Sequence, residues 1–107
     1  MALYETTFII RPELAQADVE KVVASFEEVI TSAGDKLIKK EFWGLRDLAY
    51  KIKKSKKGHY VHFGFEAKAS TISELRRRLG ISEDIIRDLT IKVEKISNDN
   101  TNLNSED

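Results

Sequence analysis

The sequence contains no cysteine, and it has only one proline, one tryptophan and two histidines among 107 residues. Without cysteine the chain forms neither a disulfide nor a thiolate site, which is typical of a protein kept in a reducing compartment. Its first residues lack the basic segment and the apolar run of a secretory signal, and its apolar runs are far too short for a membrane span. We therefore expect a cytoplasmic protein of one domain with a single core.

Residues that could carry out catalysis are also scarce. The only imidazoles are His59 and His62, and their odd spacing on a strand places them on opposite faces, which disfavours a shared metal ion. No glycine-rich phosphate loop follows a predicted strand, and no nucleophile has an evident base partner. One small phosphatase family binds its anion in a cradle after the first strand, but residues 11–14 here offer one arginine and no glycine. We expect no enzymatic activity, no cofactor and no bound metal.

The chain has no net charge, yet its charges are segregated along the sequence. Residues 36–57 hold nine lysines and arginines against two acids, whereas residues 1–35 have a net charge of −5 and residues 97–107 a net charge of −3. A cationic segment of this kind suits a polyanion such as RNA. The alternative is that its lysines protect an exposed sheet edge from aggregation.

Hydrophobic periodicity predicts a mixed fold of strands and helices. The predicted strands cover residues 3–10, 36–52, 60–65 and 85–93, the helices cover residues 17–33 and 69–79, and a turn covers residues 55–58. Two amphipathic helices each need an apolar sheet face to pack on. The order therefore predicts a ferredoxin-like βαββαβ fold, an antiparallel sheet of strand order 4-1-3-2 with both helices on one face. Residues 1–96 form this domain, and the polar residues 97–107 are predicted to be a disordered tail.

Glycines and polar side chains mark the expected ends and irregularities of these elements. Gly34 is expected to end the first helix in a left-handed conformation, and Gly44 to mark a bulge in its strand. The segment from Thr71 to Glu74 has the spacing of a helix capping box. The inward stripe of the first helix is predicted to consist of Val19, Val22, Val23, Phe26, Ile30 and Ala33.

Alternation along the later strands predicts which side chains meet the helices. On the third strand the predicted inward side chains are Val61, Phe63 and Phe65, and those facing away are Tyr60, His62 and Gly64. On the last strand the apolar residues Leu89, Ile91 and Val93 alternate with Asp88, Thr90 and Lys92. This pattern predicts a last strand with one solvent-exposed face.

We place the function in the hairpin over residues 36–65. Cations gather near its turn, and apolar residues such as Trp43 and Leu45 alternate with charges along its first strand. Apolar side chains on an edge strand favour a protein partner in addition to RNA. A comparison with the RNA-recognition motif, which stacks bases on aromatic residues, gives only a partial match, because Tyr60 is joined on its face only by His62. An ordinary surface or interface role for Tyr60 is the simpler interpretation.

The segments Gly44–Ile52 and Gly58–Tyr60 resemble the bacterial small-subunit ribosomal protein S6 family. Tyr4, Pro12 and Arg87 support the resemblance, which extends over residues 3–95. It implies a structural, non-catalytic component of the small ribosomal subunit that is monomeric when isolated. The family pairs with ribosomal protein S18, and the pair binds the central domain of small-subunit ribosomal RNA.

Charge pattern and resemblance together define two sets of candidate residues. The candidates for RNA contact are Arg46, Lys51, Lys53, Lys54, Lys56, Lys57 and Arg87. The candidates for the partner-protein interface are Trp43, Leu45, Leu48, Tyr50 and Tyr60. The alternative from another class is a small-molecule regulatory module of the same fold, which would need a ligand crevice between subunits.

Overall fold

The computed structural model describes residues 1–52 and 54–96. The predicted disordered tail, residues 97–107, and the RNA-contact candidate Lys53 lie outside the described residues. The elements follow the predicted order and are β1 (Ala2–Ile10), α1 (Gln16–Ser32), β2 (Lys36–Ile52), β3 (Ser55–Ala67), α2 (Ala69–Ile81) and β4 (Ile85–Val93).

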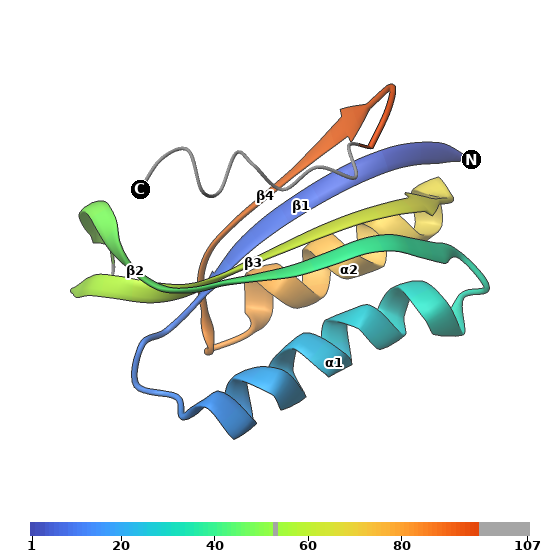
Figure 1. Ribbon diagram of the computed structural model, residues 1–107. Helices are drawn as coiled ribbons and strands as arrows, with labels where there is room; N and C mark the ends of the chain where they lie inside the picture. The colour runs from blue at the N-terminus through green and yellow to red at the C-terminus, as the bar shows by residue number, and fades with distance from the viewer. Residues whose placement is uncertain (53, 97–107) are drawn as a thin grey trace.

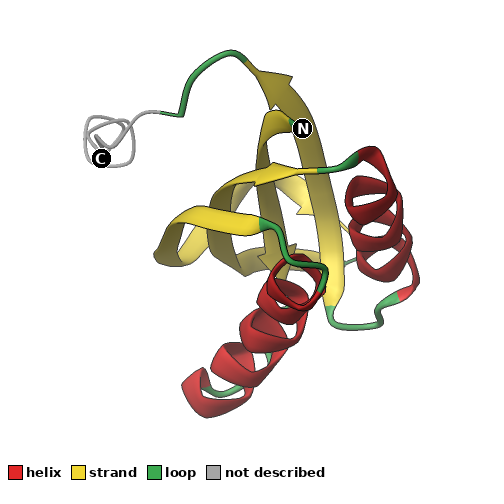
Figure 2. Cartoon of the chain, turned by 90° about the vertical axis from the view of Figure 1, so that its right-hand side faces the viewer, coloured by secondary structure: helices red, strands yellow, loops and turns green. Residues whose placement is uncertain are grey.

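The strands form one antiparallel sheet with the order β2-β3-β1-β4. Both helices pack on the same face, below the sheet in Figure 1 and to one side of it in Figure 2. The ferredoxin-like prediction is therefore confirmed, including its strand order. Neither helix of the described residues lies on the other face of the sheet, and we call it the helix-free face.

The core lies between the sheet and the two helices. The side chains of Val61, Phe63 and Phe65 are fully buried there, as the alternation predicts. Phe8 lies edge-to-face against Phe26 of α1 and Phe63 of β3, with ring centroids 5.4 and 5.3 Å apart. Aromatic pairs in this geometry add to the stabilisation from burial alone.

The inward stripe of α1 differs from the prediction at its end. Val29 belongs to the buried set although it was not predicted there. Ala33 is exposed, because α1 ends at Ser32 and the chain then turns through Gly34, whose φ is +83°. The left-handed conformation predicted at Gly34 is thus confirmed.

The turn predicted over residues 55–58 is wrong. Residues 55–58 instead begin β3, and Ser55 pairs with Ile52 across a much tighter turn in which Lys54 has a φ of 68°. Gly58 serves close packing rather than a turn. A Cβ atom there would overlap the side chain of Ile9 and lie 3.3 Å from the carbonyl oxygen of Ile10.

The bulge predicted at Gly44 is present. Phe42 pairs with Val61 and Gly44 pairs with Tyr60, so Trp43 is an extra residue on β2, and Gly44 has a φ of +85°. Beyond the bulge the hairpin formed by β2 and β3 curls away from the helices (Figure 1). This curl brings its end over the helix-free face.

The capping box predicted from Thr71 to Glu74 is wrong, because α2 already begins at Ala69. The Thr71 hydroxyl donates to the carboxylate of Asp35, which precedes β2, and Lys68 donates to the same carboxylate from its Nζ (2.8 Å) and its backbone N–H (3.4 Å). These hydrogen bonds lower the pKa of Asp35 below its usual value, and the bond from Nζ of Lys68 has the largest effect. Burial acts in the opposite direction but is outweighed. A carboxylate distant in sequence thus supplies an acceptor at the start of α2.

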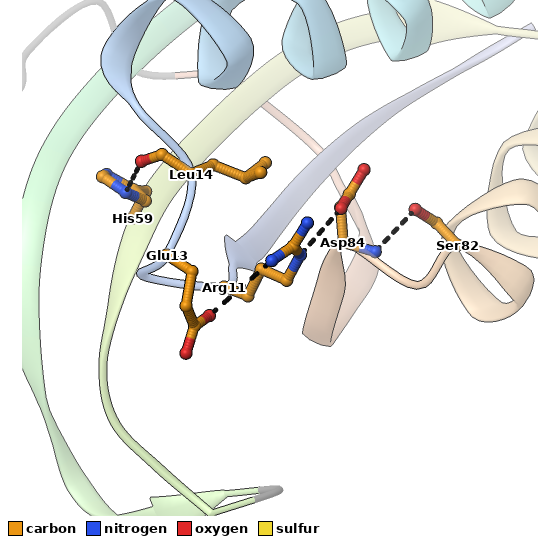
Figure 3. A network of polar contacts seen from close by, with 6 residues as sticks. All are labelled: Arg11, Glu13, Leu14, His59, Ser82 and Asp84. Atoms are coloured by element: carbon orange, nitrogen blue, oxygen red, sulfur yellow. Dashed lines mark hydrogen bonds and ion pairs between the residues drawn. The ribbon is translucent and has the colours of Figure 1, made fainter.

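A polar network ties the connection after β1 to neighbouring elements (Figure 3). Arg11 donates from Nε to the carboxylate of Asp84 at 2.8 Å and from its backbone N–H to the Asp84 carbonyl, also at 2.8 Å. His59 on β3 contacts the Leu14 carbonyl at 3.2 Å. The one arginine after β1 is therefore engaged in joining β1 to the start of β4.

Candidate functional site

Exposed lysines gather at the far end of the hairpin. The described members of this cationic hairpin end are Lys51, Lys54, Lys56 and Lys57. Lys57 has an acidic neighbour, with its Nζ 3.9 Å from Oδ1 of Asp47, but both side chains are largely in water. A pair of this kind contributes little binding energy of its own. Lys56 and Lys57 are consecutive on β3 and so point to opposite sides of the hairpin, which therefore carries positive charge on both of its sides.

Arg87, the candidate on β4, is linked to this hairpin end through Tyr50. Its Nη1 donates to the Tyr50 hydroxyl at 2.6 Å, and its guanidinium carbon lies 5.9 Å from the centre of the Tyr50 ring. The curl of the hairpin makes this contact possible, since β2 and β4 are the two opposite edges of the sheet. Arg87 thereby contacts the residue that precedes Lys51, despite its distance along the chain.

Arg46 differs from the lysines because it also supports the bulge. It is half-buried, and its Nε donates to the Trp43 carbonyl at 3.0 Å. It pairs with Gly58 across the hairpin. Its side chain thus has a structural role in addition to any contact with RNA.

Aromatic rings cluster on the helix-free face next to the bulge. The Trp43 ring is nearly parallel to the rings of His62 and Tyr60, at centroid distances of 5.3 and 6.4 Å. Its Nε1 donates to Oε1 of Glu41 at 3.1 Å. Trp43 therefore turns away from the helix-packed core and forms a half-buried cluster with β3.

The predicted partner interface is divided between the two sides of the sheet. Trp43, Leu48, Tyr50 and Tyr60 lie on the helix-free side. Leu45 does not join them, because it pairs with His59, which in turn pairs with Ile10 of the core. Its side chain is half exposed on the side where the helices lie.

His62 has the environment of a structural residue. Its Nδ1 lies 2.9 Å from the Thr7 hydroxyl, and its Nε2 lies 4.0 Å from Oε1 of Glu5. Burial lowers the pKa of His62, and the nearby carboxylates of Glu5 and Glu41 only partly oppose this effect. The neutral imidazole is therefore favoured.

The alternation on the last strand predicted that its polar side chains form the solvent-exposed face and its apolar side chains the covered one. This prediction is wrong, because Leu89 and Ile91 are the exposed side chains. The hydroxyls of Thr6 and Thr90 meet at 2.8 Å on the helix side, which places Leu89 and Ile91 on the helix-free face. Beside Leu89 lies a pocket of about 290 Å³ between the curled hairpin end and the sheet. Its apolar walls include Ile9, Leu48, Tyr50, Ile52, Tyr60 and Leu89.

Within residues 1–52 and 54–96 no group of three potential metal ligands occurs. No helix in the same part of the chain is both long and apolar enough to cross a membrane. The two histidines lie on opposite faces, as predicted, with His59 toward Leu14 and His62 toward Thr7.

Comparison with known proteins identifies the family. Residues 3–92 match the sequence profile of the family described as ribosomal protein S6. The chain belongs to this family. Small ribosomal subunit protein bS6 of Gluconobacter oxydans is 47% identical over 96 residues, which cover 90% of this chain and 60% of that protein. The Rickettsia prowazekii protein of the same name is 44% identical over 99 residues, which cover 92% of this chain and 82% of that protein.

A solved structure agrees with this assignment. The crystal structure of 30S ribosomal protein S6 from Thermotoga maritima matches with a TM-score of 0.81 and 27% identity, over 98% of this chain and 92% of that one. The chain spans about three fifths of the length of the Gluconobacter oxydans relative. The predicted family, the ferredoxin-like fold and the cytoplasmic ribosomal location are confirmed by membership in this family.

Proposed function

We propose that the chain is a structural, non-catalytic component of the small ribosomal subunit that binds the central domain of its ribosomal RNA together with ribosomal protein S18. The observation that carries this proposal is the position of the cationic hairpin end beside an apolar, aromatic surface on the helix-free face. The isolated chain is a monomer in this proposal. Membership in the S6 family supports the ribosomal role.

In this proposal the cationic residues bind RNA and the apolar and aromatic residues bind the partner protein. The proposed phosphate contacts are Arg46, Lys51, Lys53, Lys54, Lys56, Lys57 and Arg87, and the proposed partner contacts are Trp43, Leu45, Leu48, Tyr50 and Tyr60. If five to six of these seven residues contact phosphates at once, the slope of log affinity against log salt is about −3 to −5. Because the rest of the chain adds no net positive charge, we expect weak RNA binding until the partner is present.

The experiment is binding to the central RNA domain, with and without purified S18, at two salt concentrations. The test variant combines Lys54→Ala, Lys56→Ala and Lys57→Ala at the hairpin end. Losing three contacts should reduce the salt slope by about 2–3. The matched control, Lys21→Ala with Lys36→Ala and Arg76→Ala, removes three exposed cations elsewhere and should bind like the unchanged chain.

Two results would count against the proposal. Equal affinity of the hairpin variant and the control would mean that these lysines only protect the sheet edge. Tight, sequence-specific RNA binding by the isolated chain would contradict dependence on the partner.

A further inference from the structure

The chain turns back over the sheet after β4 ends at Val93 (Figure 1). Ile96 is half-buried, and its side chain lies against Gly64 of β3. A Cβ atom at Gly64 would lie 2.8 Å from Cγ2 of Ile96, so the glycine leaves the space that the isoleucine fills. Gly64 faces away from the helices, because it alternates with the buried Phe63 and Phe65. Since β1 lies between β4 and β3, Ile96, the last described residue, lies above the helix-free face and not beyond the β4 edge.

The residues that follow Ile96 in the sequence are negatively charged. Residues 97–107 lie outside the described part of the chain and contain three acids but no lysine or arginine. Two of these acids, Glu106 and Asp107, are adjacent in sequence. Carboxylates and RNA phosphates bind the same ammonium groups, so this segment is suited to compete with RNA for lysines of the hairpin.

Two lysines of the cationic hairpin end are within reach of these acids. Lys56 shares the orientation of Gly64, since an even number of residue steps on β3 separates them, and it therefore faces the helix-free side. Lys54 lies beside it at the turn, and both lysines are exposed. The eight steps from Gly64 to Lys56 cover roughly 26 Å along β3. The ten steps from Ile96 to Glu106 span up to roughly 33 Å, which is enough to reach the lysines.

We propose that the acidic residues 106–107 bind Lys54 and Lys56 within the same chain and so lower its affinity for RNA. The seat of Ile96 on β3 holds the start of the acidic segment above the helix-free face, which keeps the acids at an effective concentration in the millimolar range. This inference rests on the proposed function, because RNA is the ligand with which the acids compete. It adds that the chain covers part of its own RNA site, so RNA binds the fraction of molecules in which the acids are displaced.

The first test measures binding to the central RNA domain in the presence of S18. The test variant, Glu106→Gln with Asp107→Asn, removes two negative charges from the acidic segment. The matched control, Glu20→Gln with Asp18→Asn, removes two from exposed positions on α1. At about 50 mM salt we expect the test variant to bind about two- to fivefold more tightly than the control, and the difference to shrink at about 200 mM salt.

The gain in affinity should depend on the hairpin lysines. In a chain that also carries Lys54→Ala and Lys56→Ala, neutralising residues 106 and 107 should bring no gain, because the two changes remove the same contact. Equal affinities of the test variant and the α1 control at low salt would overturn the inference. A gain that persists without the two lysines would overturn it as well.

The second test detects the contact without RNA. Because the chain has no cysteine, Ser105→Cys gives a single attachment site for a nitroxide spin label. We expect paramagnetic broadening of the amide signals of Lys54 and Lys56 and none along α1. The broadening should disappear at high salt and when Glu106→Gln and Asp107→Asn are added. Broadening that is absent from these lysines, or that persists in the neutral variant, would contradict the proposal.

The role of the seat is tested with the same spin label. Ile96→Ala removes most of the side chain that fills the space at Gly64, and Ile81→Ala, at an isoleucine that is 67% exposed on α2, is its control. The broadening should weaken in Ile96→Ala alone, and equal broadening in both variants would show that the seat does not direct the acids. If the broadening is seen but the unchanged chain binds no RNA even with S18, the proposed function fails while the intramolecular contact stands. If RNA binds but the broadening is absent, only this inference fails.

Discussion

The guanidinium of Arg87 on β4 donates a hydrogen bond of 2.6 Å to the hydroxyl of Tyr50 near the end of β2. These strands are the two outer strands of the sheet, so the bond bridges its edges across the helix-free face. It holds the curled hairpin end over the pocket that Tyr50 and Arg87 both line.

We expect Tyr50→Phe to loosen the hairpin end without unfolding the domain. The ring is kept, but the acceptor for Arg87 is lost. An exposed hydrogen bond of this kind contributes about 0.5–1 kcal/mol. Amide hydrogen exchange around residues 48–52 should accelerate several-fold, while exchange in β1 stays the same. Unchanged exchange at the hairpin end would show that the bond does not hold it.

Gly58→Ala should destabilise the fold by about 1–3 kcal/mol, since the new methyl group meets the buried Ile9 side chain and the Ile10 carbonyl. Gly80→Ala is the matched control. Gly80 lies inside α2 with open space around it, and alanine is the better helix former, so that variant should gain about 0.5–1 kcal/mol. Urea unfolding measures both, and the prediction fails if the two variants shift in the same direction.

Phe26→Ala should lower the free energy of unfolding by about 3–5 kcal/mol, because it opens a cavity beside Phe8. Phe26 is 5% exposed, whereas Phe42 on β2 is 44% exposed. Phe42→Ala should therefore cost much less. Similar melting temperatures for the two variants would contradict the assignment of the α1 inner face.

Acid should weaken the junction between Asp35 and α2. The pKa of Asp35 lies below the ordinary value of 3.8, chiefly because Lys68, and then Thr71, donate hydrogen bonds to its carboxylate. A lowered folded-state pKa means that this contribution is complete above about pH 4 and is lost as pH falls through the folded pKa. We expect Asp35→Asn to be less stable at pH 7 and to lose less stability on acidification. Glu28→Gln, at an exposed site on α1, controls for the lost charge. Parallel pH profiles of Asp35→Asn and the unchanged chain would rule out this role.

Periodicity in the sequence was sufficient to predict the fold. The stripe through Val23 and Phe26 and the alternation of Val61, Phe63 and Phe65 each identify a buried face from local spacing alone. The bulge at Gly44 was also predictable, because a glycine within a strand often marks one.

The errors arose where distant residues decide the local structure. From the sequence alone, Thr71 resembles a capping residue of α2. In the structure its hydroxyl instead donates a hydrogen bond to Asp35, which lies between α1 and β2. The alternation on β4 shows that its apolar side chains share one face, but not which face of the sheet this is. Only its pairing with β1 shows that Leu89 lies on the helix-free face.

The candidate site was predictable only in part for the same reason. The lysines lie together because they are neighbours in sequence. The contact of Arg87 with Tyr50 depends on the curl, and the direction of Trp43 depends on the bulge. No local pattern specifies either.

The extra residue at Trp43 has a consequence for how this family can vary. If the strand kept every residue but paired without the bulge, Trp43 would lie opposite Tyr60 and Leu45 opposite Gly58, so Leu45 would share the orientation of Tyr60 and Arg46 would point to the opposite side. Deletion of Trp43 itself would remove the bulge and leave the pairs of Leu45 and Arg46 as they are. One surplus residue can therefore be lost from this strand without changing the side chains that the rest of the ribbon shows on each of its sides.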